Sequence, residues 1–229
     1  MKKFTVKASR DAKRHIKSST VLAYTKEDDS PEYWEEYFQG ISQEFTSENT
    51  SINAKKLPAL FNKISFNPGT INVDYGGGRF DNVAEYLTQY DVINLVYDPF
   101  NRTSEHNKAV IDTIREAGGA DSATLANVLN VIKEPEVRLD VLRKMKKMLK
   151  PNAPVYIQIY EGNGSGEGSP TSSGYQTNKK AKDFEDEIKQ YFPDAKRKGN
   201  LWYATNSGGV TASTRIKASS DISNGLVFI

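Results

Sequence analysis

The sequence predicts a doubly wound α/β fold, in which helices cover both faces of a mostly parallel β-sheet. Short, almost wholly apolar runs such as VINLVY (92–97) and VYIQIY (155–160) have the length and composition of strands buried on both faces. Segments with helical periodicity separate these runs along the chain. A glycine cluster, DYGGGRFD (74–81), stands between the first strand and the following helix, where such folds bind ligands.

The first elements follow in order from about residue 53. The stretch LPALF at 57–61 predicts a short helix, and the β-branched run at 70–74 predicts a buried strand. Residues 79–89 have the pattern of an amphipathic helix. Residues 92–97 predict a second buried strand, which ends at Asp98 and the proline after it.

The second half repeats this alternation. The expected elements are a helix at 105–117, a strand at 123–128, a helix at 134–149, a strand at 155–160, a helix at 179–191 and strands at 195–197 and 201–205. The Gly/Ser-rich stretch 162–174 is expected to be a lid or a disordered loop. We expect a mostly parallel sheet whose last strand is antiparallel.

Two extensions flank the expected domain at 53–206. Residues 1–52 are polar and predict a partly helical N-terminal extension. Its aromatic residues, among them Phe45, are expected to pack on the main body or to form part of a lid. Residues 207–229 are rich in Ser and Thr and are expected to form a flexible tail or a small hairpin around the Asn-Gly pair at 224–225.

Composition removes several kinds of chemistry. The chain has no cysteine, which excludes disulfides, thiolate zinc sites and cysteine nucleophiles. Its two histidines, His15 and His106, form no HExxH motif, and no G-x-S-x-G elbow is present, so neither a metal site nor a serine hydrolase is expected. With 31 basic and 29 acidic residues, the net charge of +2 gives no global attraction to nucleic acid or membranes.

The sequence shows no membrane or secretion signal. Its start, MKKFTVKASRDAKRH, is basic but lacks the apolar region of a signal peptide. No apolar run approaches the roughly 20 residues that cross a bilayer. We therefore expect a soluble, cytoplasmic protein without a membrane partner, whose oligomeric state the sequence leaves open.

The glycine cluster allows several interpretations. A tight turn that needs positive φ is one of them. A P-loop is excluded, because no G-K-[ST] follows. A dinucleotide fingerprint, G-x-G-x-x-G, would have its third glycine at Asp81, where a carboxylate would repel a pyrophosphate. A cofactor without phosphate, made of an amino-acid end, a sulfonium and an adenosine, fits better.

Two acids have the spacing that such a cofactor requires. Asp74, ahead of the glycines, can attract the ammonium and sulfonium groups, while the bare backbone of Gly76 and Gly78 lets the cofactor lie against the turn. Asp98 follows the next strand, 20 residues beyond Gly78, and can accept hydrogen bonds from both ribose hydroxyls. This pair of acids is the most informative spacing in the chain.

Together these motifs resemble the class I S-adenosylmethionine-dependent methyltransferases. The D-x-G-x-G pattern, the acid after the second strand and the stretch from ANVLNVIKEP to LKPN (126–152) match that layout over about residues 55–206. The resemblance implies a Rossmann-like methyltransferase sheet, S-adenosylmethionine as cofactor and methyl transfer as activity. The cofactor-binding residues that it implies are Asp74, Tyr75, Gly76, Gly77, Gly78, Asp98, Pro99 and Asn127.

The phrasing is closest to that of methyltransferase-like proteins associated with DNA phosphorothioation. The similar stretches are 74–80, 97–99, 128–138 and, loosely, 174–179. This resemblance implies that nucleic acid is a possible acceptor, within a DNA-modification or mobile-element system. Lys179, Lys180 and Lys182 are expected to contact such an anion or simply to be solvated.

The chain departs from the family pattern in one consequential place and in minor ones. Only one helix and no clear strand lie between Asp98 and Ala123, so one strand-helix unit is expected to be missing and the residue that contacts adenine cannot be assigned. Gly77 stands where the family varies, and we give it no structural role.

The catalytic candidates lie at the ends of the third and fourth expected strands. Asn127 is expected to hold the cofactor or an acceptor, or to cap the next turn. Tyr160 and Glu161 are expected to face the same crevice as base or orienting group. Because no base is obvious and no amino-group DNA methyltransferase signature is present, a non-catalytic S-adenosylmethionine-binding or interaction module is the alternative, and an NAD-type oxidoreductase is a remote third.

Overall fold

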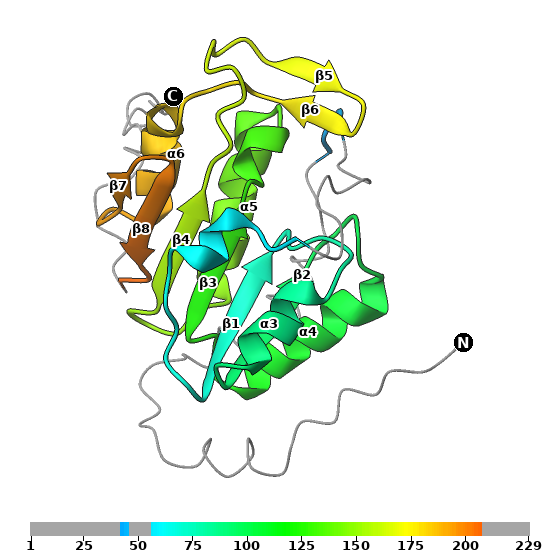
Figure 1. Ribbon diagram of the computed structural model, residues 1–229, viewed down its shortest axis with the longest axis vertical. Helices are drawn as coiled ribbons and strands as arrows, with labels where there is room; N and C mark the ends of the chain where they lie inside the picture. Colours follow the sequence, from blue (N-terminus) through cyan, green and yellow to red (C-terminus); the bar gives the residue numbers. More distant parts are fainter. Residues whose placement is uncertain (1–41, 46–55, 208–229) are drawn as a thin grey trace, which may run out of the picture.

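The computed structural model describes residues 42–45 and 56–207 (Figure 1). Its main feature is a six-stranded sheet in the order β2-β1-β3-β4-β8-β7, accompanied by a separate hairpin, β5-β6. The strands are β1 (Thr70–Tyr75), β2 (Val92–Tyr97), β3 (Ser122–Ala126), β4 (Pro154–Gln158), β5 (Ser169–Thr171), β6 (Gly174–Gln176), β7 (Lys196–Lys198) and β8 (Leu201–Thr205).

The sheet confirms the predicted α/β class. β1, β2, β3 and β4 are parallel to their neighbours, whereas β8 is antiparallel to both β4 and β7. The helices are η2 (Ala59–Asn62), α3 (Asn82–Thr88), α4 (Ser104–Glu116), η3 (Leu129–Val131), α5 (Pro135–Lys147), η4 (Ala181–Phe184) and α6 (Glu185–Tyr191). The carboxyl ends of the four parallel strands therefore meet at one edge, below the β5-β6 hairpin (Figure 1).

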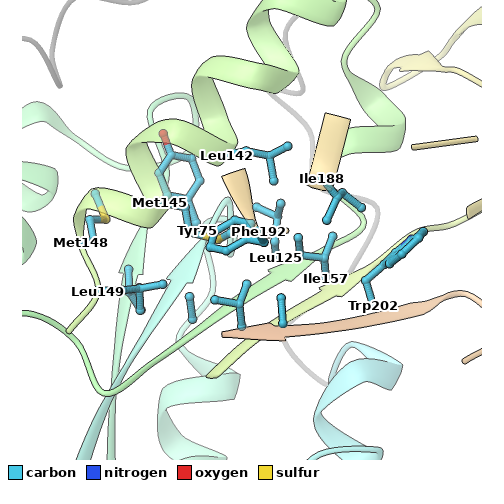
Figure 2. Packing of buried hydrophobic residues seen from close by; sticks show 14 of the residues in the cluster. Tyr75, Leu125, Leu142, Met145, Met148, Leu149, Ile157, Ile188, Phe192 and Trp202 are labelled. Atoms are coloured by element: carbon cyan, nitrogen blue, oxygen red, sulfur yellow. The ribbon is translucent and has the colours of Figure 1, made fainter. Parts of the chain in front are cut away.

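Two apolar clusters lie on opposite faces of the sheet. The larger joins the sheet to α4, α5 and α6, and Figure 2 shows Tyr75, Leu125, Leu142, Ile157 and Trp202 within it. The smaller joins the sheet to η2 and α3. The neighbouring residues 201 and 202 of β8 belong to different clusters, as expected for successive side chains of a strand. Both faces of the sheet are thus covered.

The predicted absence of one strand-helix unit is visible in the topology. β2 is an edge strand, and α4 leads directly from β2 to β3 on the other side of β1. The first turn of α4 partly replaces the missing neighbour of β2. His106 Nε2 donates to the Val96 carbonyl (2.8 Å), and the Asn107 side chain bonds both the N–H and the carbonyl of Asp98 (3.0 and 2.8 Å). His106 therefore supports the sheet edge.

Several expected boundaries moved. The strand expected at 123–128 ends at Ala126, because Asn127 has φ +59° and turns the chain. The helix expected at 179–191 is a 3-10 turn followed by the short α6. The Gly/Ser-rich stretch contains most of the β5-β6 hairpin.

The expected N-terminal helix and C-terminal hairpin lie outside the described residues. None of the helices within 42–45 and 56–207 has the length and apolar character needed to span a bilayer.

Candidate functional site

A cavity of about 690 Å³ opens at the carboxyl ends of the parallel strands. Its walls come from the glycine loop at 74–78, the stretch 97–101 after β2, residues from 126–132 after β3, one side of α5 and the β5-β6 hairpin. Ligand sites of doubly wound folds lie at this edge of the sheet. The volume lies within the range of about 300–1,000 Å³ that is typical of small-molecule sites.

Two positions of the glycine loop, Gly76 and Gly77, have no room for a side chain. Gly76 and Gly78 adopt left-handed backbone, with φ of +73° and +80°. A Cβ atom on Gly76 would lie 2.6 Å from Val128 Cγ2, and one on Gly77 would lie 2.6 Å from Asp74 Oδ2. Gly77 therefore has a steric role that the sequence did not predict.

Arg102 holds the glycine loop in place, and sequence reasoning missed it. Its Nε donates to the Gly78 carbonyl (2.8 Å), and its Nη2 donates to the Phe80 carbonyl (2.9 Å) and to Asp81 Oδ1 (2.7 Å). Asp81 is thus paired with a guanidinium, so the predicted repulsion of a pyrophosphate is weaker than the sequence suggested. Only the position of Arg102, shortly after the second strand, could have indicated this role.

Replacing Arg102 with alanine should destabilise the protein and loosen the loop. Two carbonyls lose a charged donor, so we expect the free energy of unfolding to fall by about 2–3 kcal/mol in urea denaturation. The Asp81→Asn variant is the control. It removes only an ion pair whose carboxylate is 65% exposed, which should cost less than about 1 kcal/mol. Equal losses in the two variants would contradict the role given to the carbonyl contacts.

Asp98 connects the loop to the end of β2. Its Oδ2 accepts the Gly78 N–H (2.9 Å), and its Oδ1 accepts the N–H groups of Phe100 and Asn101 (both 2.9 Å). The Asn101 side-chain amide lies 3.2 and 3.3 Å from the two oxygens. Since a carboxylate offers about four acceptor positions, Asp98 alone cannot also take both ribose hydroxyls. Binding of both ribose hydroxyls therefore also requires Asn101, which lines the cavity beside Asp98.

Asp74 lies beneath the loop, in a polar part of the sheet. Its carboxylate accepts the Thr124 hydroxyl (2.9 Å), and Asn72 donates to Thr124 Oγ1 (3.0 Å) and to Asn94 Oδ1 (2.7 Å). Burial raises the pKa of Asp74 from 3.8 to about 6, although the Thr124 hydrogen bond acts in the opposite direction. The charge of Asp74 therefore faces the cavity from below the loop and depends on pH.

The raised pKa predicts a pH dependence of stability. The folded state binds the proton more tightly than the unfolded state, so this group makes stability fall as pH rises from about 4 to about 6. The change corresponds to roughly 3 kcal/mol. In urea denaturation from pH 4 to pH 7, Asp74→Asn should therefore gain about that much relative to the wild type. An Asp112→Asn variant should show no such trend, and a constant difference for Asp74→Asn would contradict the assignment.

Aromatic and charged residues form the side of the cavity next to α5. The rings of Tyr75 and Tyr97 lie 4.8 Å apart, and Tyr75 packs into the larger core cluster (Figure 2). Burial, with the charges of Asp140 and Asp98, raises the pKa of Tyr97 to about 12. Lys144 is buried and pairs with Asp140 (2.7 Å). Neither Asp140 nor Lys144 was predicted, since both resemble ordinary positions of an amphipathic helix.

The predicted catalytic residues do not all meet in the cavity. Asn127 and Tyr160 line it, as does Pro99 among the cofactor candidates. The next turn, η3, has Val128 as its N-cap residue and no side-chain cap, so the capping alternative for Asn127 is not supported. Glu161 is not among the lining residues, and its Oε1 accepts the Ala181 N–H (2.7 Å). The expectation that Glu161 faces the crevice is therefore wrong.

Asn130 organises the opposite side of the cavity. Its Oδ1 accepts the Tyr160 N–H (3.2 Å), its Nδ2 donates to Gln176 Oε1 (3.1 Å), and Gln176 Nε2 donates to the Tyr160 carbonyl (3.0 Å). These three bonds form a closed ring that connects η3, the end of β4 and β6.

In the described part of the chain, no group of three or more His, Cys, Asp or Glu residues could hold a metal ion.

Comparisons with known proteins give likenesses of structure only. No protein-family model matches the chain, and no curated protein is significantly similar to it. Among solved structures, the 1,6-didemethyltoxoflavin N1-methyltransferase of Burkholderia thailandensis is 15% identical, with a TM-score of 0.45 over 62% of this chain and 72% of that one.

Two further structures are similar at the same level. A S-adenosylmethionine-dependent methyltransferase of Methanosarcina mazei is 12% identical, with a TM-score of 0.43 over 66% of this chain and 96% of that one. An O-methyltransferase family protein of Burkholderia thailandensis is 18% identical, with a TM-score of 0.39 over 61% of this chain and 52% of that one, so the chain spans about half its length. Likenesses this weak establish neither activity nor substrate.

Proposed function

We propose that the protein is an S-adenosylmethionine-dependent methyltransferase. The observation that carries this proposal is the glycine loop, whose bare backbone borders the cavity and is fixed to the Asp98 carboxylate at the end of the next strand. Such a surface suits a ligand that lies flat against the main chain.

The residues present fit the chemical parts of this cofactor. Asp98 Oδ2 and the Asn101 amide can bond the ribose hydroxyls, and the buried charge of Asp74 favours an ammonium and a sulfonium above the loop. When bound, S-adenosylmethionine supplies an electrophilic methyl group. The chain then has to hold an acceptor in line with that methyl and exclude water, a task for the Asn127 and Tyr160 side of the cavity.

A nucleic-acid acceptor, suggested by the phosphorothioation resemblance, finds little support in the lining. Among the described residues, the charged ones in this lining are three carboxylates, Asp74, Asp98 and Asp140, and one lysine, Lys144, which is paired. The lysines at 179, 180 and 182 do not line the cavity. Apart from the paired Lys144, the described lining therefore lacks the cations that usually bind a phosphate backbone.

A non-catalytic cofactor-binding module is the second candidate. The observation that favours it is the lack of a clear base: no histidine of the described residues lines the cavity, and Glu161 is engaged elsewhere. Such a module would bind the cofactor as tightly as an enzyme but transfer no methyl group.

Calorimetry separates these possibilities first. We expect S-adenosylmethionine and S-adenosylhomocysteine to bind and NAD not to bind. Transfer of a labelled methyl group should then be measured against DNA, RNA, a protein pool and a small-molecule extract. Binding without transfer to any pool would favour the module, and NAD binding without either sulfur nucleoside would reject the proposal.

A further inference from the structure

The cavity wall beneath the β5-β6 hairpin consists of neutral side chains. Its lining residues are Tyr160, Thr171, Ser172, Ser173, Tyr175 and Gln176. They offer two phenol rings with their hydroxyls, three aliphatic hydroxyls and one amide. The charged lining residues all belong to β1, the end of β2 and α5, and within the described chain no Lys or Arg belongs to the hairpin wall.

This wall is held rigidly from behind. The hydrogen-bond ring of Asn130, Tyr160 and Gln176 fixes the backbone of Tyr160 and the side chain of Gln176. Asn130 is only 1% exposed, and its carbonyl also accepts the Thr177 N–H (2.8 Å). The hairpin therefore cannot shift without breaking bonds to η3 and β4. A wall fixed in this way is preorganised for one shape of ligand.

The N-terminal segment at 42–45 extends the same wall. The Phe45 ring stacks on Tyr175, with centroids 5.3 Å apart and an interplanar angle of 22°. Lys133 Nζ lies 5.7 Å from the centroid of Phe45 and pairs with Glu44, whose N–H donates to Glu134 Oε1 (2.8 Å). Figure 1 shows this segment directly below the hairpin. Phe45 is thus a positioning residue for the Tyr175 ring.

We infer that this part of the cavity binds the methyl acceptor, and that the acceptor is a neutral, planar small molecule with hydrogen-bonding groups. The inference rests on the proposed function. Aromatic rings prefer flat partners, and the hydroxyls and the amide can bond polar groups at the edge of such a partner. The carboxylates of Asp74 and Asp98 disfavour an anion in the same cavity.

A pair of probes with matched shape tests the inference. The full chain, saturated with S-adenosylhomocysteine, is titrated with 2-naphthol, with 6-hydroxynaphthalene-2-sulfonate and with oligothymidylate. We expect 2-naphthol to bind at least about tenfold more tightly than the sulfonate, and oligothymidylate not to displace it.

Variants then place the binding on the hairpin wall. Tyr175→Ala should weaken 2-naphthol binding by about tenfold, and Phe45→Ala by less, because Phe45 acts through the Tyr175 ring. Both should leave the affinity for S-adenosylhomocysteine within about twofold. Tyr90→Ala, which removes an exposed tyrosine outside the cavity, is the matched control.

Each result has one meaning. Failure to bind S-adenosylhomocysteine rejects the cofactor assignment. In protein that binds it, absence of 2-naphthol binding, equal binding of the sulfonate, displacement by oligothymidylate, or an unchanged affinity in Tyr175→Ala rejects the neutral planar acceptor.

Discussion

Replacing Asp98 with alanine is expected to weaken S-adenosylhomocysteine binding by at least about 100-fold, measured by calorimetry. The substitution removes the acceptor of the Gly78, Phe100 and Asn101 N–H groups, so both the loop and the turn after β2 lose their common anchor. It also removes the proposed partner of the ribose. Within residues 42–45 and 56–207, no other single side chain combines these two roles.

Two further variants make the result interpretable. Asp98→Asn keeps the shape of the side chain but replaces one acceptor oxygen with an amide donor. Its affinity for S-adenosylhomocysteine should therefore lie between those of the wild type and Asp98→Ala. Asp112→Ala removes an exposed carboxylate from α4 and should bind normally. Circular dichroism establishes that each variant is folded. A folded Asp98→Ala variant with unchanged affinity would disprove the role of this residue.

Gly76→Ala should have the second-largest effect. Alanine there must adopt left-handed backbone and place its Cβ 2.6 Å from Val128 Cγ2. We expect a loss of about 2–4 kcal/mol in the free energy of unfolding, part from backbone strain and part from the collision. The displaced loop should also lose most of its affinity for S-adenosylhomocysteine. Urea denaturation and calorimetry measure the two effects.

Gly199→Ala separates strain from collision. Its φ is +62°, but no heavy atom beyond its two chain neighbours lies within 4 Å of the added Cβ, so about 1 kcal/mol is expected from strain alone. The double variant Gly76→Ala, Val128→Ala removes the colliding side chain. Its loss in the free energy of unfolding should therefore be smaller than the sum of the losses of the two single variants. If Gly76→Ala costs no more than Gly199→Ala, the contact with Val128 is unimportant.

The order of elements was predictable because the relevant signals are local. β2 was placed at its observed bounds, since an apolar run followed by Asp98 and a proline allows little else. The missing strand-helix unit was predictable from the short distance between Asp98 and Ala123. The end of β3 was not, because the sequence does not show that Asn127 leaves the extended conformation. The predicted end of a strand is wrong where the backbone dihedral angles of a single residue decide it.

The site was predictable to a different extent. The residues at strand ends, such as Asp74, Asp98 and Tyr160, do line one cavity, because parallel strands bring their carboxyl ends together. Arg102 and Asn130 were missed as supports, since their bonds join segments that no periodicity relates. Glu161 was misplaced because a side chain one residue beyond a strand can turn either way, and it bonds the Ala181 N–H.

The stack of Phe45 on Tyr175 bears on how the chain can be divided. The expected domain boundary at residue 53 lies just before η2, the first described helix. Two residues before that boundary nevertheless contribute to the cavity: Gln43 lines it, and Phe45 supports the Tyr175 ring. A fragment that starts at residue 53 would keep the described strands and helices while losing this support. We therefore expect such a fragment to fold but to bind the proposed acceptor more weakly than the full chain does.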